Sequence, residues 1–188
     1  MLFNTLNFLI FILVVCIIFY FTPKRWQAFV LTLSSAIFYM YWDIKFIFLV
    51  LFCTLIDYFA AIRIEKSINI IIQRFWLLIA LISNLSVLSY FKYSNFILSN
   101  LNHFLVKPIS FVQVILPVGI SFYTFQSISY TVDVYRKKIK AEKSFLYFFL
   151  YVLFFPQLVA GPIERADHML KQFKNNLRLN WQDLDIIC

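Results

Sequence analysis

Charged residues are scarce in this chain. Only 14% of its 188 residues are Asp, Glu, Lys or Arg, whereas 62% are hydrophobic, including 24 Phe and 11 Tyr. A soluble domain carries roughly 25% charged residues to cover its surface, so a soluble globular domain is excluded. The net charge of +8 does not indicate nucleic-acid binding, because the cations form short clusters between apolar runs instead of one solvated face.

Cysteine and histidine are also few. The three cysteines have neither paired nor metal-ligand spacing, so we expect neither a disulfide nor a metal site. Only His103 and His168 could serve as a histidine general base. The sequence also lacks internal repeats and low-complexity linkers, and it therefore predicts a single membrane domain over residues 1–188.

Long uncharged runs fill most of the chain and predict an all-α, polytopic transmembrane helix bundle. A cleaved signal peptide is an alternative for the first run, but that run has no basic start and no small-residue cleavage site. A segment near residues 95–106 is predicted to be interfacial or re-entrant, and residues 166–179 to form an amphipathic helix at the membrane surface. The apolar helices, about six, are expected at residues 2–21, 26–42, 45–62, 75–91, 117–134 and 145–158.

The distribution of Lys and Arg predicts the orientation of the chain. If the predicted helices alternate in direction and the N-terminus lies outside, the inner loops hold ten cations and the outer loops three. Cytoplasmic loops carry an excess of Lys and Arg. We therefore expect an extracytoplasmic N-terminus and a cytoplasmic position for the basic stretch at residues 136–143.

Two segments place prolines, both glycines and ionisable groups within apolar sequence: LPVGISFYTFQSISYTVDVYR at residues 116–136 and FFPQLVAGPIER at residues 154–165. Lipid cannot hydrogen-bond a broken backbone or solvate a charge, so such sequence requires partners from protein or a water-filled cavity. We therefore expect re-entrant or broken helices around a funnel or tunnel. The candidate lining residues are Asp57, Lys92, Gln126, Tyr130, Asp133, Arg136, Gly161, Pro162, Glu164 and Arg165.

These polar groups also have structural interpretations. Asp57 is costly in an apolar span unless it is paired, with Arg63 or Lys92 as conceivable partners, and a structural hydrogen bond between helices is an alternative role. The helix at residues 117–134 carries a polar stripe that could likewise hold helices together instead of lining a tunnel. The stripe consists of Gln126, Ser127, Ser129, Tyr130 and Asp133. Within that stripe, Asp133 could form an ion pair with a cation three residues later, Arg136.

The two breaker-containing segments resemble the paired signatures of the membrane-bound O-acyltransferase (MBOAT) family, in particular its bacterial branch for alginate O-acetylation and D-alanine transfer. Ile56-Asp57-Tyr58 and Phe91-Lys92-Tyr93 extend the resemblance over most of the chain. The resemblance implies a many-helix fold around an intramembrane funnel. There, an acyl group would pass from a donor reached from the cytoplasmic side to a hydroxyl of a cell-envelope polysaccharide or related acceptor.

The resemblance also implies a location and partners. It places the chain in the bacterial inner membrane, with the lipid bilayer, an acyl-donor protein and other envelope-polysaccharide modification proteins as partners. It implies no bound cofactor, and acyl-CoA or an acyl carrier as the donor.

The family's catalytic histidine lies in an apolar segment without a counterpart in these 188 residues. We therefore expect this chain to be the N-terminal part of a longer domain, with no catalytic residue of its own. We also expect it to be inactive alone, because loss of a general base slows acyl transfer ~10²–10⁴-fold. A non-catalytic membrane remnant is one alternative. A transporter-like helix bundle is another, since transporters also contain broken helices, although no pseudo-repeat is visible in this sequence.

Overall fold

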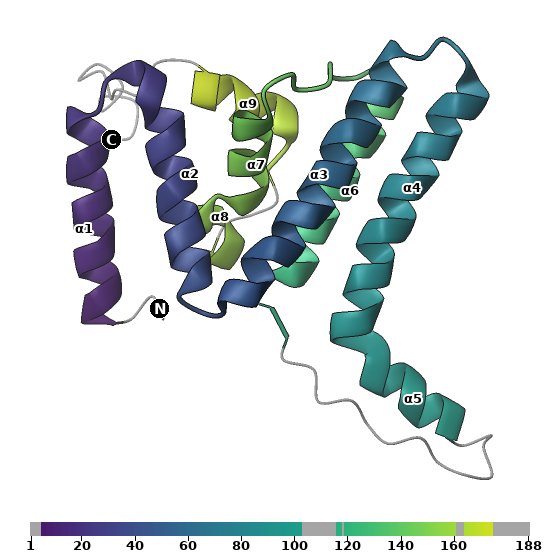
Figure 1. Ribbon diagram of the computed structural model, residues 1–188, viewed down its shortest axis with the longest axis horizontal. Coiled ribbons are helices and arrows are strands. Elements are labelled where there is room, and N and C mark those ends of the chain that lie inside the picture. Colours follow the sequence, from purple (N-terminus) through teal and green to yellow (C-terminus); the bar gives the residue numbers. More distant parts are fainter. Residues whose placement is uncertain (1–4, 103–115, 118, 161–163, 175–188) are drawn as a thin grey trace, which may run out of the picture. The chain divides into compact units, whose positions relative to one another are not determined.

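The computed structural model describes residues 5–102, 116–117, 119–160 and 164–174 (Figure 1). Every element of regular secondary structure within these ranges is helical, so the predicted all-α fold is confirmed. The chain divides into two compact units, one formed by residues 1–51 and 142–188 and the other by residues 52–141. The expectation of a single membrane domain stays a prediction.

Aromatic side chains hold the first unit together. Its helices are α1 (Leu6–Phe21), α2 (Lys24–Met40), α7 (Phe145–Leu153), α8 (Phe155–Ala160) and α9 (Ala166–Lys174). α2 contacts α1, α7 and α8. The ring centre of Phe38 in α2 lies 6.1 Å from that of Phe8 and 5.4 Å from that of Phe155. All three rings are buried, and they join α1, α2 and α8.

The helix predicted over residues 145–158 is broken at Phe154, where α7 ends and α8 follows. Pro156 has no N–H to donate, and within a continuous helix its ring would clash with the carbonyl four residues earlier. It therefore lies in the first turn of α8, where neither defect matters. The freed N–H of Phe155 donates to the Ser35 hydroxyl of α2 at 3.4 Å. The expected broken helix is confirmed here, and a neighbouring helix satisfies its backbone.

The amphipathic helix expected at residues 166–179 is present as α9 as far as Lys174, and residues 175–179 lie outside the described residues. Its apolar face packs against α7 and consists of the buried residues Ala166, Met169, Leu170 and Phe173. At its end, the Lys174 ammonium group pairs with the buried carboxylate of Glu142 at 2.6 Å. α9 is thus fixed at both its apolar face and its last turn.

The second unit is built around three helices that lie side by side, α3, α4 and α6 (Figure 1). Its elements are α3 (Ile44–Lys66, whose first residues belong to the first unit), α4 (Ile70–Leu88), the π-helical turn η1 (Ser89–Tyr93), α5 (Ser94–Asn102) and α6 (Ile120–Tyr135). Of the segment expected to be interfacial or re-entrant near residues 95–106, the part up to Asn102 continues α4 through η1, and residues 103–106 lie outside the described residues. Its position at the membrane stays a prediction. Neither proline nor glycine interrupts residues 70–102, so the helix only bends there.

α6 begins later than predicted. The sequence places Pro117 in its first turn, but the first helical residue is Ile120 and Gly119 is the N-cap. Gly119 has φ of 71°, a left-handed conformation that glycine adopts without steric cost. The helix therefore begins after Gly119, and Pro117 lies outside it.

In α4, the polar side chains face the interior of the second unit and apolar side chains face outward. In α4, Gln73 and Asn84 are buried. The opposite face carries exposed Ile71, Phe75, Leu78, Ile82 and Leu85. A helix of a soluble protein has the reverse arrangement. Within the described residues, α3 and the continuous helix Ile70–Asn100 are long and apolar enough to cross a membrane. These features are those of a membrane protein.

Candidate functional site

A buried carboxyl group joins the three central helices of the second unit. Asp57 of α3 is completely buried. The amide nitrogen of Asn84 in α4 donates to both Asp57 carboxyl oxygens, at 2.7 and 2.9 Å. The Ser127 side chain of α6 is a further hydrogen-bond partner of Asp57. One carboxyl group therefore connects α3, α4 and α6 in their common interior.

This finding decides between the two predicted roles of Asp57, an ion pair with Arg63 or Lys92 and a hydrogen bond between helices. Arg63 lies six residues further along α3, a spacing that puts it on a different face of the helix, and its guanidinium lies 5.9 Å from the Trp76 ring centre. Lys92 is exposed in η1 and donates to the Ser121 hydroxyl at 3.0 Å. The alternative role, a hydrogen bond between helices, is confirmed by the contact with Asn84.

More polar groups surround Asp57 in the interior. Two buried oxygens have no hydrogen-bond partner among the described residues, Asn84 Oδ1 and Thr124 Oγ1. Thr124 lies one turn before Ser127 on α6, so both face the same side. Further buried polar residues on α3 and α6 are Thr54, Gln126, Tyr130 and Thr131. Unpartnered buried oxygens are costly in low-dielectric surroundings, so this polar interior is a candidate functional site.

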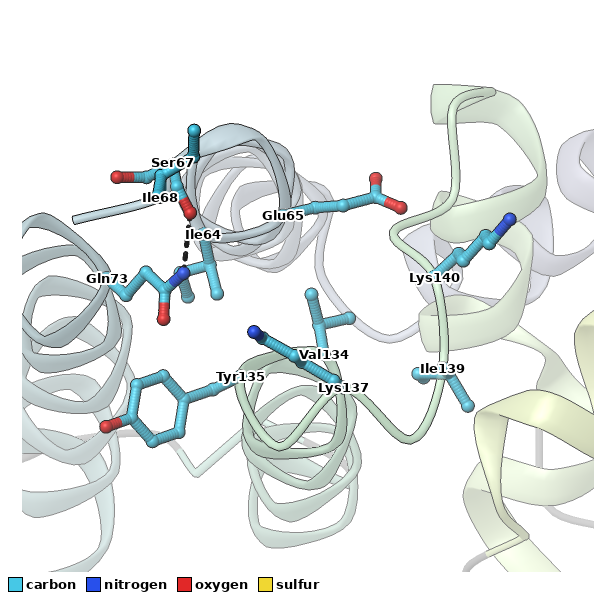
Figure 2. A pocket seen from close by; sticks show the side chains of 10 residues that line it. All are labelled: Ile64, Glu65, Ser67, Ile68, Gln73, Val134, Tyr135, Lys137, Ile139 and Lys140. Carbon is cyan, nitrogen blue, oxygen red and sulfur yellow. Dashed lines mark hydrogen bonds between the residues drawn. The ribbon is translucent and has the colours of Figure 1, made fainter. Parts of the chain in front are cut away.

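The interior face leads from this cluster to a cavity at the end of α3 and α6. Asp57 and Ile64 are seven residues apart on α3, as are Ser127 and Val134 on α6. Each pair therefore lies on one face, about 10 Å apart along its helix. Ile64 and Val134 line a cavity of about 420 Å³. Its lining, shown in Figure 2, is completed by Glu65, Ser67, Ile68, Gln73, Tyr135, Lys137, Ile139 and Lys140.

The cavity brings together two loops that are distant in the sequence. The loop between α3 and α4 contributes Ser67, whose carbonyl oxygen accepts a hydrogen bond from the Gln73 side chain at 2.6 Å. The loop after α6 contributes two cations, Lys137 and Lys140, and Figure 2 shows Lys137 pointing into the space. Glu65 is the acidic residue in the lining. The cavity therefore carries a net positive charge.

An unusual turn places Lys137 there. Its φ is 59°, a left-handed conformation that costs roughly 1–2 kcal/mol for a residue other than glycine. The Lys137 N–H donates to the Val134 carbonyl at 2.9 Å, and the Lys138 N–H donates to that of Asp133 at 3.0 Å, which is the Schellman pattern of a helix end. The same turn brings the Lys138 ammonium 3.8 Å from the Asp133 carboxylate. The expected ion pair of Asp133 with Arg136 is therefore wrong.

The predicted lining residues are distributed over both units. Gln126 and Tyr130 are completely buried in α6, but Ser129 of the same stripe is exposed, so the stripe does not occupy a single face. Arg136 is exposed, as are Glu164 and Arg165 in the first unit. The hydroxyl of Tyr151 donates to the Glu164 carbonyl oxygen at 3.4 Å. Two further candidates, Gly161 and Pro162, lie outside the described residues.

Sequence reasoning did not identify the cavity residues. The sequence assigns Lys137 and Lys140 only to a topology signal, and it predicts no role for Gln73. The available signal was the prediction that the loops containing them lie on the same side of the membrane. The left-handed turn at Lys137 has no sequence signal, because glycine is the residue expected there.

Several curated proteins are similar to this chain. It is 34% identical to the probable alginate O-acetylase AlgI of Pseudomonas aeruginosa over 84% of its length, and 36% identical to that of Azotobacter vinelandii over 84%. It is 35% identical to the peptidoglycan O-acetyltransferase of Helicobacter pylori over 86% of its length. The chain is homologous to bacterial membrane O-acetyltransferases. The predicted resemblance to this branch of membrane-bound O-acyltransferases is confirmed.

The homology to these O-acetyltransferases covers only part of them. The chain spans about a third of the length of the curated relatives it matches, between 31% and 35% for these three proteins. No protein-family model and no solved structure matches the chain. The polar cluster around Asp57 and the basic cavity are thus features of one segment of an O-acetyltransferase homologue.

Proposed function

We propose that this chain forms part of a membrane enzyme that transfers acetyl groups to hydroxyls of a cell-envelope polysaccharide. The observation that carries the proposal is its homology to proteins named for two different polysaccharides, alginate and peptidoglycan. Esterification of a sugar hydroxyl is common to both. In this reaction the hydroxyl oxygen bonds to the acetyl carbonyl carbon, the donor's leaving group departs with the electrons of the broken bond, and a base takes the hydroxyl proton.

Within this enzyme, we assign the basic cavity to the anionic part of the acetyl donor. Residues 63–74 and 136–143, which contain its loops, carry eight Lys and Arg, and cytoplasmic segments carry such an excess, so we place this end of the second unit in the cytoplasm. Acyl-CoA and acyl carriers both hold the acyl group on a phosphate-bearing arm. Lys137, which points into the cavity (Figure 2), would bind a phosphate through a charge-assisted hydrogen bond. Lys140 would add positive charge at the rim, and the apolar residues Ile64 and Val134 would contact the rest of the arm.

We assign the general base to a residue other than His168. This histidine is exposed on α9, and its ring nitrogen lies 3.4 Å from the Gln172 amide. A base must reach the acceptor hydroxyl within hydrogen-bond distance, and the buried polar groups of the described residues lie on other helices. The predicted acyl-donor protein would act on the cytoplasmic side, and the other modification enzymes on the side that holds the polysaccharide.

Deletion of the gene in its source bacterium tests the proposal. Acetate released from purified envelope polysaccharide by mild alkali is measured in the parent, the deletion strain and the strain complemented with the intact gene. We expect the deletion to remove this acetate and the intact gene to restore it. Unchanged acetate in the deletion strain would contradict the proposed function.

Matched variants in the complementing gene test the assigned residues. Lys137→Gln with Lys140→Gln should lower the acetate at least about tenfold, because a charge-assisted hydrogen bond contributes ~1.5 kcal/mol or more. Lys138→Gln removes a neighbouring cation outside the cavity and should leave the acetate unchanged. His168→Ala should also leave it unchanged. Loss of acetate with His168→Ala, at wild-type protein levels, would refute the assignment of the base.

A further inference from the structure

A second cavity, of about 640 Å³, lies between α3 and α4. These two helices are the described segments long and apolar enough to cross a membrane. At one end its lining contains Arg63, Lys66 and Ser67, and the acidic Glu65 lines the other cavity instead. Arg63 and Lys66 are three residues apart on α3 and therefore share one face. This end of the cavity is suited to an anion.

The walls of this cavity are aromatic and aliphatic. Phe59 and Ile62 line it from α3, and Ile72 and Trp76 from α4. Phe59 is 55% exposed and Ile72 45%, so the walls continue into the apolar outer faces of both helices. Because those faces contact lipid in a membrane protein, the cavity opens toward lipid and not only toward water.

The cationic and apolar parts are held in a fixed relation. The Arg63 guanidinium lies 5.9 Å from the centre of the Trp76 ring, a cation–π distance that orients the side chain. From Lys66 to Phe59 the lining extends seven residues along α3, about 10 Å. A ligand that fills this site has an anionic group at one end and an apolar chain at the other.

We propose that this cavity binds an anionic phospholipid, with its phosphate between Arg63 and Lys66 and an acyl chain along Phe59 and Trp76. Arginine binds phosphate oxygens bidentately, and lysine adds a point charge. Basic pockets between membrane helices bind anionic headgroups in this way. The lipid fills the space between α3 and α4 and binds independently of acetyl transfer.

The test is a lipid titration of the purified full chain in a mild detergent, followed by native mass spectrometry. Phosphatidylglycerol is compared with zwitterionic phosphatidylethanolamine of the same acyl chains. We expect the wild type to retain one phosphatidylglycerol in preference. Arg63→Gln with Lys66→Gln should weaken binding roughly thirtyfold, because each cation near a membrane surface changes the affinity about fivefold.

A charge-matched control separates a defined site from general attraction. Arg74→Gln with Arg136→Gln removes two exposed cations that line neither cavity, and it should leave the affinity within about twofold of the wild type. Equal losses in both double variants, or equal affinity of the wild type for both lipids, would overturn the proposal.

Two further measurements distinguish a lipid site from a phosphate site. They also keep the test valid if the double variant cannot be studied. Trp76→Leu keeps every charge but removes the surface under Arg63 and beside the acyl chain, and it should weaken phosphatidylglycerol binding about tenfold. If the double variant fails to fold, this variant decides the matter. Inorganic phosphate at millimolar concentration should not displace the lipid. Unchanged binding with Trp76→Leu, or displacement by phosphate, would refute a phospholipid site.

Discussion

Replacing Asn84 by Leu should destabilise the second unit by about 2 kcal/mol. Asp57 is completely buried, and Asn84 reaches both of its carboxyl oxygens. A buried polar group that loses its partner costs ~1–3 kcal/mol, whereas hydrogen bonds between membrane helices contribute on average ~0.6 and at most ~1.7 kcal/mol. Because Asn84 makes two hydrogen bonds to Asp57, we expect a loss of stability at the upper end of the values for membrane helices. The unfolding equilibrium should change by about 30-fold.

The double variant Asp57→Leu with Asn84→Leu isolates the hydrogen bond from packing. Leu has a similar size to both residues, and removal of both polar partners leaves neither unsatisfied, which is often nearly neutral. The Ser127 hydroxyl, left without Asp57, can donate to a carbonyl one turn earlier in α6. We therefore expect the double variant to be within about 1 kcal/mol of the wild type and more stable than Asn84→Leu alone.

The assay is unfolding of the purified chain in detergent micelles by increasing dodecyl sulfate, followed by the fluorescence of its four tryptophans. Asn100→Leu is the matched control, because Asn100 is exposed and its side chain bonds only within its own helix. This control should change the free energy of unfolding by less than about 0.5 kcal/mol. Equal stability of Asn84→Leu and the wild type, or a double variant less stable than either single one, would refute the reasoning.

Substitutions at three other places test separate parts of the fold by the same unfolding assay, two of them with a comparison variant. Ser35→Ala removes the acceptor at the break before α8 and should cost about 1 kcal/mol; no change would mean that the freed N–H has another partner. Lys137→Gly relieves a left-handed residue and should stabilise the chain by up to about 1 kcal/mol, whereas Lys138→Gly should not. Glu142→Gln breaks the ion pair with Lys174 and should cost about 1 kcal/mol, and an equal cost in Lys174→Gln would indicate that the pair acts as a unit.

The positions of most helices were predictable because lipid imposes a simple rule. A span requires a predominantly apolar run of sufficient length, and such runs mark α1 to α4, α6 and α7 directly. The helix boundaries that were wrong depend on single residues. Pro156 ends α7 earlier than expected because its ring acts four residues back, and Gly119 delays α6 because its left-handed φ precedes the helix.

The candidate site was less predictable because its contacts join residues far apart in the sequence. The cost of burying Asp57 predicted that it has a partner, either a cation or a hydrogen bond to a neighbouring helix, but not that the partner is Asn84. The partner of Asp57 depends on which faces of α3 and α4 are in contact. The basic cavity depends on the left-handed conformation of Lys137, which no residue pattern in this loop predicts.

Transfer of a labelled acetyl group tests the central claim most directly. Membranes from the deletion strain and from the complemented strain are supplied with the same labelled donor mixture and envelope polysaccharide. We expect label in alkali-labile ester on the polysaccharide only with complemented membranes, and much less label with the double variant Lys137→Gln and Lys140→Gln. Equal labelling by both membranes would contradict the assignment of this chain to a polysaccharide O-acetyltransferase.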